Sequence, residues 1–372
     1  MSKNHIICRN ILLKIFVAVF ILSIFTSCNE NFRVKVIQND GTPLSKLLFV
    51  SYCQNVYGID YENLDCHVHL KLNTFTSQPL VYNNQIFFGD NGTDIGKWGN
   101  SVFVLDSSFK FKTQIESVPN IYRLSVYDNY LIASSACYFG GDVQTGLQGG
   151  FSLIDLSDLK NILIYEKLPG MLNNSGNCYG YKNNLYLSTS SEKFIENSNK
   201  ISRFSLDNFE ISEVTSLTEQ EFQTEYSPEA VINKNHLWVS YFECPIIDVF
   251  YLGTNEKIKR IDLRKYFTEF KDECITSPEK NNFWFNHSFV HDDVYYIDAC
   301  KRYGNETDGN YIFLIDSNSF ELIRILPIDA YIRYLYDIKV VDEYSDYLFL
   351  NFGNRLMKVS AKTGQIEKEI IF

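Results

Sequence analysis

Polar side chains recur at a fixed position along this chain, eight residues before five short apolar runs of similar composition. Five residues before the same runs, no polar side chain occurs. Amide, guanidinium and carboxylate groups that converge in space can hydrogen-bond a polar ligand and fix its orientation. The recurring polar residues are Gln78, Arg123, Asn177, Glu229 and Asn286, and Arg333 joins them in the last repeat after a correction for length.

Three polar segments, residues 90–100, 134–150 and 299–310, add aromatic and basic side chains. Aromatic rings beside polar groups are the ingredients of a pocket for a small molecule or a peptide. The candidate contacts in these segments are Trp98, Tyr138, Arg302 and Tyr303.

Catalytic and metal-binding patterns are weak by comparison. His67 and His69 place two imidazoles on one face of a strand, but no third metal ligand follows at a useful spacing. His287 and His291 are close enough in sequence to meet across a turn. Glu229 is the only carboxylate of the recurring set, and glycoside hydrolysis needs two. Without a GxSxG, HExxH or P-loop motif, the sequence predicts no metal and no cofactor, and favours a protein that is not an enzyme.

The first residues carry a targeting signal. Lys3, Arg9 and Lys14 precede an apolar run over 15–25, which is too short to span a membrane comfortably. A basic start, a short apolar core and small residues before a cleavage point are typical of a secretory signal peptide.

The segment 25–28, Phe-Thr-Ser-Cys, resembles a lipobox of Bacteroidetes-type lipoproteins, although Phe25 stands where leucine is usual. The resemblance implies cleavage after residue 27 and attachment of acyl chains such as palmitate to Cys28. It also implies a membrane-anchored protein of the cell envelope, with the outer membrane as the expected location and the leaflet left open. The alternative is an ordinary signal peptide followed by an incidental cysteine.

Removal of residues 1–27 removes three positive charges and no negative ones, so the net charge falls from −11 to −14. An acidic surface argues against nucleic acid and anionic lipid headgroups as partners.

Seven cysteines remain besides Cys28, an odd number that cannot all pair within one chain. The first pair to test is Cys53 with Cys66, which closes a short loop, and buried free thiols are the alternative.

The elements that must position the polar residues are short strands. Residues 284–328 contain four runs rich in aromatic and β-branched residues, separated by Asp, Asn, Ser and Gly. The chain contains six such units, this one included, and residues 33–73 contain further runs that supply a seventh. Four-stranded units that cannot bury both faces alone close into a ring. The sequence predicts an all-β protein, a β-propeller of seven four-stranded blades, with six blades as the alternative.

The segment GGFSLIDLSDLKN at 149–161 resembles the LVIVD repeat of propellers in secreted and lipid-anchored bacterial proteins. FVLDSS at 103–108 and FLIDSN at 313–318 are closer to YVTN-type and quinoprotein-like propellers. Arg203 and Lys358 interrupt the pattern in two units. The resemblance covers one strand and turn in each blade and implies the fold more than an activity. The expected organisation is a signal peptide (1–27), a lipidated tether (28–32) and one propeller domain (33–372).

In a propeller, the first strand of each blade lines the central channel, so the six polar residues are expected to ring its mouth, and the three long segments to lie over it. Such a mouth is wet in any propeller, so polar residues there do not by themselves require a ligand. The favoured hypothesis is a lipid-anchored envelope propeller that binds a protein, peptide or glycan. The alternatives are an envelope enzyme, either a carbohydrate-active hydrolase or lyase or a quinone-dependent dehydrogenase, and a purely structural envelope protein.

Overall fold

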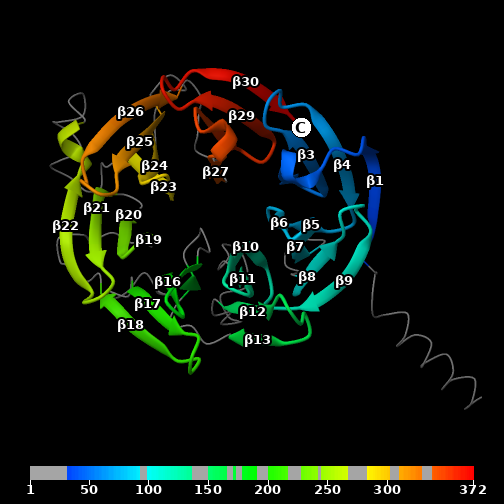
Figure 1. The fold of residues 1–372 in the computed structure, drawn as a ribbon, viewed down its shortest axis with the longest axis horizontal. Coiled ribbons are helices and arrows are strands. Elements are labelled where there is room, and N and C mark those ends of the chain that lie inside the picture. The colour runs from blue at the N-terminus through cyan, green and yellow to red at the C-terminus, as the bar shows by residue number, and fades with distance from the viewer. Residues whose placement is uncertain are drawn as a thin grey trace, which may run out of the picture.

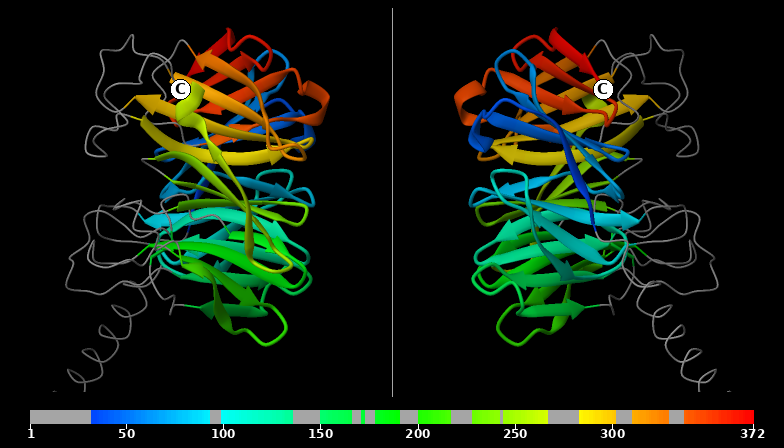
Figure 2. Two further views of the ribbon diagram at one scale, coloured as in Figure 1. Left: turned by 90° about the vertical axis from the view of Figure 1, so that its left-hand side faces the viewer. Right: turned by 90° about the vertical axis from the view of Figure 1, so that its right-hand side faces the viewer.

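The computed structural model describes residues 32–92, 99–135, 150–165, 171–172, 178–190, 200–216, 228–241, 244–266, 283–301, 310–328 and 337–372. Their strands form seven separate antiparallel sheets. The sheets are arranged as blades around a common centre (Figure 1), and side views show them packed face to face around the ring (Figure 2). The predicted seven-bladed β-propeller is confirmed, and the six-bladed alternative is wrong.

The blades are numbered in chain order. Blade 1 contains β1 (Val34–Asn39), β2 (Leu47–Tyr52), β3 (Asn55–Asp60) and β4 (Cys66–Leu72). Blade 2 contains β5 (Phe75–Thr76), β6 (Leu80–Tyr82), β7 (Gln85–Gly92), β8 (Ser101–Leu105) and β9 (Phe111–Glu116). Blade 3 contains β10 (Ile121–Tyr127), β11 (Tyr130–Ser135), β12 (Phe151–Asp155) and β13 (Ile162–Tyr165). Blade 4 contains β14 (Met171–Leu172), β15 (Cys178–Tyr181), β16 (Asn184–Ser190), β17 (Lys200–Ser205) and β18 (Ile211–Ser216).

Blade 5 contains β19 (Pro228–Asn233), β20 (His236–Tyr241), β21 (Cys244–Tyr251) and β22 (Glu256–Asp262). Blade 6 contains β23 (Phe283–His291), β24 (Val294–Lys301), β25 (Asn310–Asp316) and β26 (Leu322–Ile328). Blade 7 contains β27 (Asp337–Lys339), β28 (Tyr347–Asn351), β29 (Arg355–Ser360) and β30 (Ile366–Ile371). Short 3-10 helices occur at η1 (Leu44–Lys46), η3 (Leu263–Tyr266) and η6 (Asp342–Tyr344). Among the residues described above, no helix has both the length and the apolar character needed to cross a membrane.

In blades 2 to 7 the strands follow one another from the centre outwards, and the innermost strands of blades 2 and 4 are each split into two pieces. Blade 1 differs, because its strand order is β1-β4-β3-β2. The first strand of the chain therefore lies at the outer rim of the ring, beyond β4, while the buried β2 lies innermost (Figure 1).

Turn residues account for the hairpins. The two-residue turns between first and second strands contain residues with a positive φ angle: Asn84 (55°), Asp128 (53°) and Asp293 (62°). Asn and Asp tolerate this left-handed conformation better than most residues do. At the end of the third strand in three blades, or directly after it, an aspartate accepts a turn N–H: Asp106 from Ser108, Asp155 from Ser157 and Asp316 from Asn318. Hydrogen bonds from these turns lower the pKa of all three carboxyls. The aspartates of the LVIVD-like and related segments are therefore turn residues.

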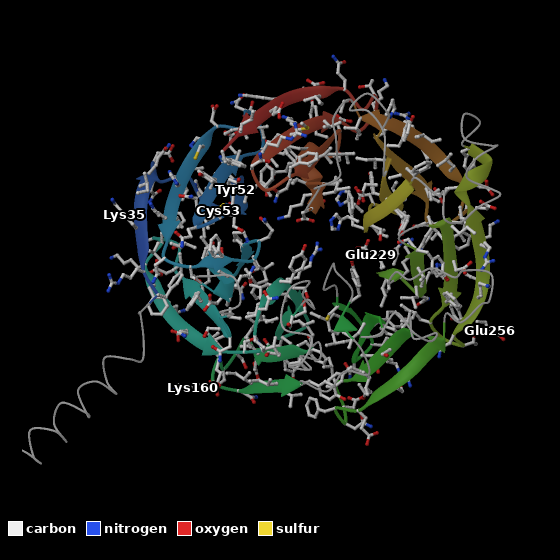
Figure 3. The ribbon with its side chains drawn as sticks, turned by 180° about the vertical axis from the view of Figure 1, so that it is seen from behind. Lys35, Tyr52, Cys53, Lys160, Glu229 and Glu256 are labelled. Atoms are coloured by element: carbon white, nitrogen blue, oxygen red, sulfur yellow. The ribbon has the colours of Figure 1, made fainter. Side chains whose placement is uncertain are left out.

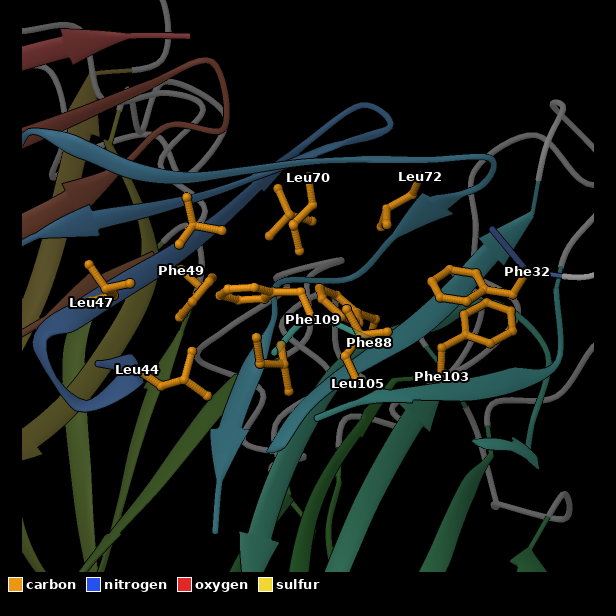
Figure 4. Close-up of a cluster of buried hydrophobic side chains, with 13 residues drawn as sticks. Phe32, Leu44, Leu47, Phe49, Leu70, Leu72, Phe88, Phe103, Leu105 and Phe109 are labelled. Carbon is orange, nitrogen blue, oxygen red and sulfur yellow. The ribbon is translucent and has the colours of Figure 1, made fainter. Parts of the chain in front are cut away.

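Apolar side chains fill the space between neighbouring blades. Trp238 of blade 5 stacks on Tyr295 of blade 6 with ring centroids 4.6 Å apart, and both side chains are fully buried. Between blades 1 and 2, a cluster of aromatic and aliphatic side chains includes Phe32, Phe88 and Phe103 (Figure 4). Phe32 stacks on Phe103 at 3.9 Å, which fixes the start of the described chain against blade 2.

The ring closes through side chains. Every strand of blade 1 comes from the start of the chain and every strand of blade 7 from its end, so no sheet in the described residues joins the two ends. Lys358 of β29 instead donates to the carbonyl oxygens of Tyr61 (3.1 Å) and Glu62 (2.8 Å) in blade 1. Its ammonium lies 4.3 Å from the centre of the Tyr347 ring, and Tyr61 packs edge-on against Phe349. The lysine that interrupts the repeat pattern thus joins the first blade to the last.

The proposed disulfide between Cys53 and Cys66 is wrong, since both are free thiols. Cys53 lies in the β2–β3 turn, two positions before β3 begins at Asn55, whereas Cys66 pairs with Ile59 near the other end of β3. Four residues of strand separate the two positions by about 13 Å, which is too far for a disulfide. Cys178 fits the buried-thiol alternative, because it is a free thiol that is 6% exposed, and burial raises its pKa to about 12.

Candidate functional site

The candidate site lies at the centre of the ring, on the face where the innermost strands of blades 2 to 7 begin, here called the mouth face. Figure 3 shows Glu229 beside the central opening. Of the six predicted ring residues, Gln78, Arg123 and Glu229 are described with their side chains. Asn286 belongs to β23, but its side chain is not described. The remaining predicted residues lie outside the described residues: Asn177, Arg333, Trp98, Tyr138, Arg302 and Tyr303.

Sheet register shows that the recurring position falls at the same place in each of three blades. Arg123 pairs with Ser134, and Glu229 pairs with Ser240, in each case the fifth residue of the second strand. In blade 7 the fifth residue of β28 is Asn351, and its partner is Asp337. Asp337 is therefore the structural equivalent of Arg123 and Glu229.

Sequence reasoning missed Asp337. The helix η6 lengthens the connection between β27 and β28, so a count of eight residues back from Leu348 ends at Val340 rather than at the site. An acidic residue at the start of a short strand before that insertion was the available signal.

Arg123 and Asp337 form an ion pair across the centre of the ring. The guanidinium Nη2 lies 3.2 Å from the carboxylate Oδ1, and the side chains are 30% and 17% exposed. The two residues come from blades 3 and 7, which are not neighbours in the ring (Figure 1). Lys339 Nζ lies 3.7 Å from the other carboxylate oxygen of Asp337. Burial is the largest single influence on the pKa of Arg123 and acts to lower it. The charge of Asp337, together with smaller contributions that include Tyr179 and Glu229, more than offsets burial, so the pKa is raised.

Tyr179 and Glu229 complete the polar cluster around this ion pair. Burial raises the pKa of the Tyr179 phenol strongly, and the nearby Glu229 carboxylate raises it further. Glu229 is only 5% exposed, and its charge acts on both Arg123 and Tyr179. Blades 3, 4, 5 and 7 thus contribute a guanidinium, a phenol and two carboxylates to one place. Such groups can hydrogen-bond hydroxyl, amide, ammonium and carboxylate groups of a ligand.

Gln78 has a structural partner. Its side-chain oxygen accepts from the backbone N–H of Ser51 at 3.0 Å, and its side-chain nitrogen donates to the Ser51 carbonyl at 3.1 Å. These bonds attach the innermost strand of blade 2 to β2 of blade 1. Because Ser51 immediately precedes the end of β2, that strand ends at the mouth face, whereas the innermost strands of blades 2 to 7 begin there.

The histidines have other partners. His291 lies at the turn end of β23, 3.5 Å from Asp342 of blade 7, and His287 lies four residues earlier on the same strand. Four residues of strand span about 13 Å, so these imidazoles do not meet across a turn, an arrangement that the sequence spacing had allowed. His69 contacts Asn55 at 3.1 Å and stacks on Tyr57.

In the described part of the chain, no group of three or more His, Cys, Asp or Glu side chains could hold a metal ion.

His67 lies between two carboxylates on the surface of blade 1, at 2.6 Å from Asp40 and 3.1 Å from Asp60. The contact with Asp40 raises the pKa of His67 above 6.5, and Asp60 adds to the increase against the opposing effect of burial. Hydrogen bonds from Thr42 and His67 lower the pKa of Asp40 from 3.8 to about 2.

Replacing His67 with glutamine is expected to lower Tm in a pH-dependent way. A raised histidine pKa stabilises the folded state fully below pH 6.5, and this contribution is lost as the pH rises through the raised value. The Asp40 contribution is present above pH 3.8 and is lost as the pH falls towards 2. The difference in Tm between wild type and variant should therefore be greatest between these limits and should shrink in alkaline solution. A difference that stays constant with pH would contradict the assignment.

No family model matches the chain, and no curated protein matches it significantly. Solved structures resemble it in fold. A structure of KlHsv2, with loop 6CD replaced by a Gly-Ser linker, has a TM-score of 0.55 at 11% identity, over 91% of this chain and 99% of the other. The dihydro-heme d1 dehydrogenase NirN, in complex with DHE, has a TM-score of 0.51 at 12% identity, over 91% and 68%. BamB from Moraxella catarrhalis has a TM-score of 0.48 at 12% identity, over 88% and 82%. At these identities the likeness concerns the fold alone.

Proposed function

We propose that this protein is a lipid-anchored β-propeller of the cell envelope that binds a protein, peptide or glycan at the mouth face. The observation that carries the binding proposal is the Arg123–Asp337 ion pair, with Tyr179 and Glu229 beside it. Charged groups placed in an enclosed position cost desolvation energy that a stable fold does not require. The lipobox at Cys28 and the LVIVD-like segment at 149–161 support an anchored envelope protein of this repeat class.

An envelope enzyme, such as a carbohydrate-active hydrolase, is the second candidate. The observation in its favour is that Asp337 adds a second carboxylate to Glu229 at the centre of the ring. The contacts of Asp337 with Arg123 and Lys339 favour a binding role instead, because these cations hold the carboxylate as an ion-pair partner and not as a free acid or base.

The test uses the mature chain with Cys28→Ala, immobilised and exposed to a glycan array and to peptides from a detergent extract of bacterial envelopes. Arg123→Met and Glu229→Gln are expected to lower retention of the captured ligand at least about tenfold, as loss of one charged hydrogen bond does. Lys160→Glu, an exposed change on the outer part of blade 3, serves as the control. Equal retention by all variants would place binding away from the mouth face, and product formation from an oligosaccharide would favour the enzyme.

Lipid attachment is tested separately by labelling cells with an alkyne-bearing palmitate. Label on the wild type that is lost in Cys28→Ala supports the anchor. An unlabelled wild type would contradict it without affecting the mouth-face proposal.

A further inference from the structure

The outer rim of blades 1 and 2 carries basic and apolar side chains side by side. Val36, Ile37 and Phe111 are 44%, 48% and 46% exposed. They belong to β1 and β9, the outermost strands of these blades (Figure 1). Phe111 lies next to Phe32, with ring centroids 5.6 Å apart, so the apolar side chains continue from one blade to the next.

The same rim is positively charged in an acidic protein. Among residues 33–39, 71 and 110–116, five are basic and one, Glu116, is acidic. Within the described part of the chain, none of the five makes an ion pair with a carboxylate. The basic residues, all exposed, are Arg33, Lys35, Lys71, Lys110 and Lys112.

Two of these lysines stand directly opposite each other in the sheet. Lys35 of β1 pairs with Lys71 of β4, and like charges at directly opposed positions destabilise a sheet. Figure 3 shows Lys35 at the outer edge of the ring. An anionic surface outside the protein would relieve this repulsion.

We infer that the rim formed by β1 and β9 rests on the membrane and contacts anionic lipid headgroups. This inference rests on the lipid anchor in the proposed function. Only residues 29–31 separate Cys28 from Phe32, which is held against Phe103. A fully extended chain would place the Phe32 Cα at most about 14 Å from the Cα of the lipidated cysteine.

The short tether and the composition of the rim agree. Exposed apolar side chains flanked by lysine and arginine are the composition of surfaces that lie in a lipid interface. With the rim on the membrane, the ring stands on edge, and the axis through its centre runs along the membrane plane. The mouth face then opens sideways, where Arg123 and Glu229 can meet a ligand. The overall acidic charge, which argues against anionic lipid as a partner, does not describe this part of the surface.

The test measures binding of the mature Cys28→Ala chain to vesicles by sedimentation. Vesicles of phosphatidylethanolamine containing phosphatidylglycerol are expected to bind the protein, and vesicles of phosphatidylcholine alone to bind it weakly. Combined Lys35→Glu, Lys110→Glu and Lys112→Glu should lower binding at least about tenfold, since each basic residue near an anionic surface contributes on the order of 1 kcal/mol. Raising the salt from about 0.1 M to about 1 M, which shortens the Debye length from about 10 Å to about 3 Å, should also weaken it.

The control is Lys160→Glu, Lys182→Glu and Lys362→Glu, which changes the net charge equally at exposed positions on blades 3, 4 and 7. Equal losses in both triple variants would reduce the effect to net charge and overturn the inference. So would binding that is unaffected by the rim variant while circular dichroism shows it folded. If palmitate labelling of Cys28 succeeds and the rim variant still binds, the rim inference fails and the anchor stands. Unlabelled Cys28 with rim-dependent binding would contradict the anchor alone.

Discussion

Replacing Lys358 with methionine is expected to lower the free energy of unfolding by about 2–4 kcal/mol, because two backbone carbonyls lose a charged hydrogen-bond donor in a buried place. Lys358 is 8% exposed, and its ammonium bonds to the carbonyl oxygens of Tyr61 and Glu62 at 3.1 and 2.8 Å. Methionine retains much of the apolar stem of Lys358, so the change mainly removes the ammonium, its two hydrogen bonds and its contact with the Tyr347 ring. Urea denaturation followed by circular dichroism measures the loss.

Lys368→Met is the matched control. Lys368 belongs to the same blade and also reaches blade 1, at 3.6 Å from Asp65, but the two side chains are 46% and 66% exposed. Exposed ion pairs contribute little, so this variant should remain within about 0.5 kcal/mol of the wild type. Equal losses in the two variants would mean that Lys358 does not close the ring. Because no sheet in the described residues joins blade 1 to blade 7, opening at this contact should also increase hydrogen exchange at β2 and β29 before the other blades.

Arg123→Met is expected to destabilise the protein by about 1–2 kcal/mol in addition to its effect on ligand binding. Among the residues with described positions, the substitution leaves Asp337, which is 17% exposed, with Lys339 at 3.7 Å as its remaining ion-pair partner. Loss of one partner from a fully buried pair costs about 3–5 kcal/mol, and the 30% exposure of Arg123 reduces this because water reaches the site. Unfolding in urea measures the cost.

A double-mutant cycle with Asp337→Asn separates the pair from its surroundings. If the ion pair joins blades 3 and 7, the double variant should be more stable than the sum of the single effects predicts, by about 1 kcal/mol. Additive effects would mean that the two side chains do not interact in solution. Lys339→Met, which removes the weaker contact of Asp337, should have a smaller effect than Arg123→Met.

The sequence pattern located only part of the polar cluster at the mouth face. Arg123 and Glu229 were identified from a constant spacing because each precedes a two-residue turn, and the turn fixes the register between first and second strands. The same count failed for Asp337, where η6 lies between the two strands. Tyr179 was not identified, because it lies two positions after the recurring position and nothing in its sequence neighbourhood distinguishes it from other strand tyrosines.

The amino-acid sequence alone predicted the strands and the turns, and it favoured seven blades over six. These features depend on local chemistry: alternating apolar residues form strands, and Asp, Asn and Gly adopt the turn conformations between them. Only the tertiary structure decided which residues meet across the ring. Arg123 and Asp337 are 214 positions apart, and their contact depends on the curvature of seven packed sheets. For the same reason Lys358, an interruption in the repeat, became the link to blade 1, and β1 proved to lie at the outer rim. Contacts of this kind depend on where each blade lies in the ring, which no local pattern contains.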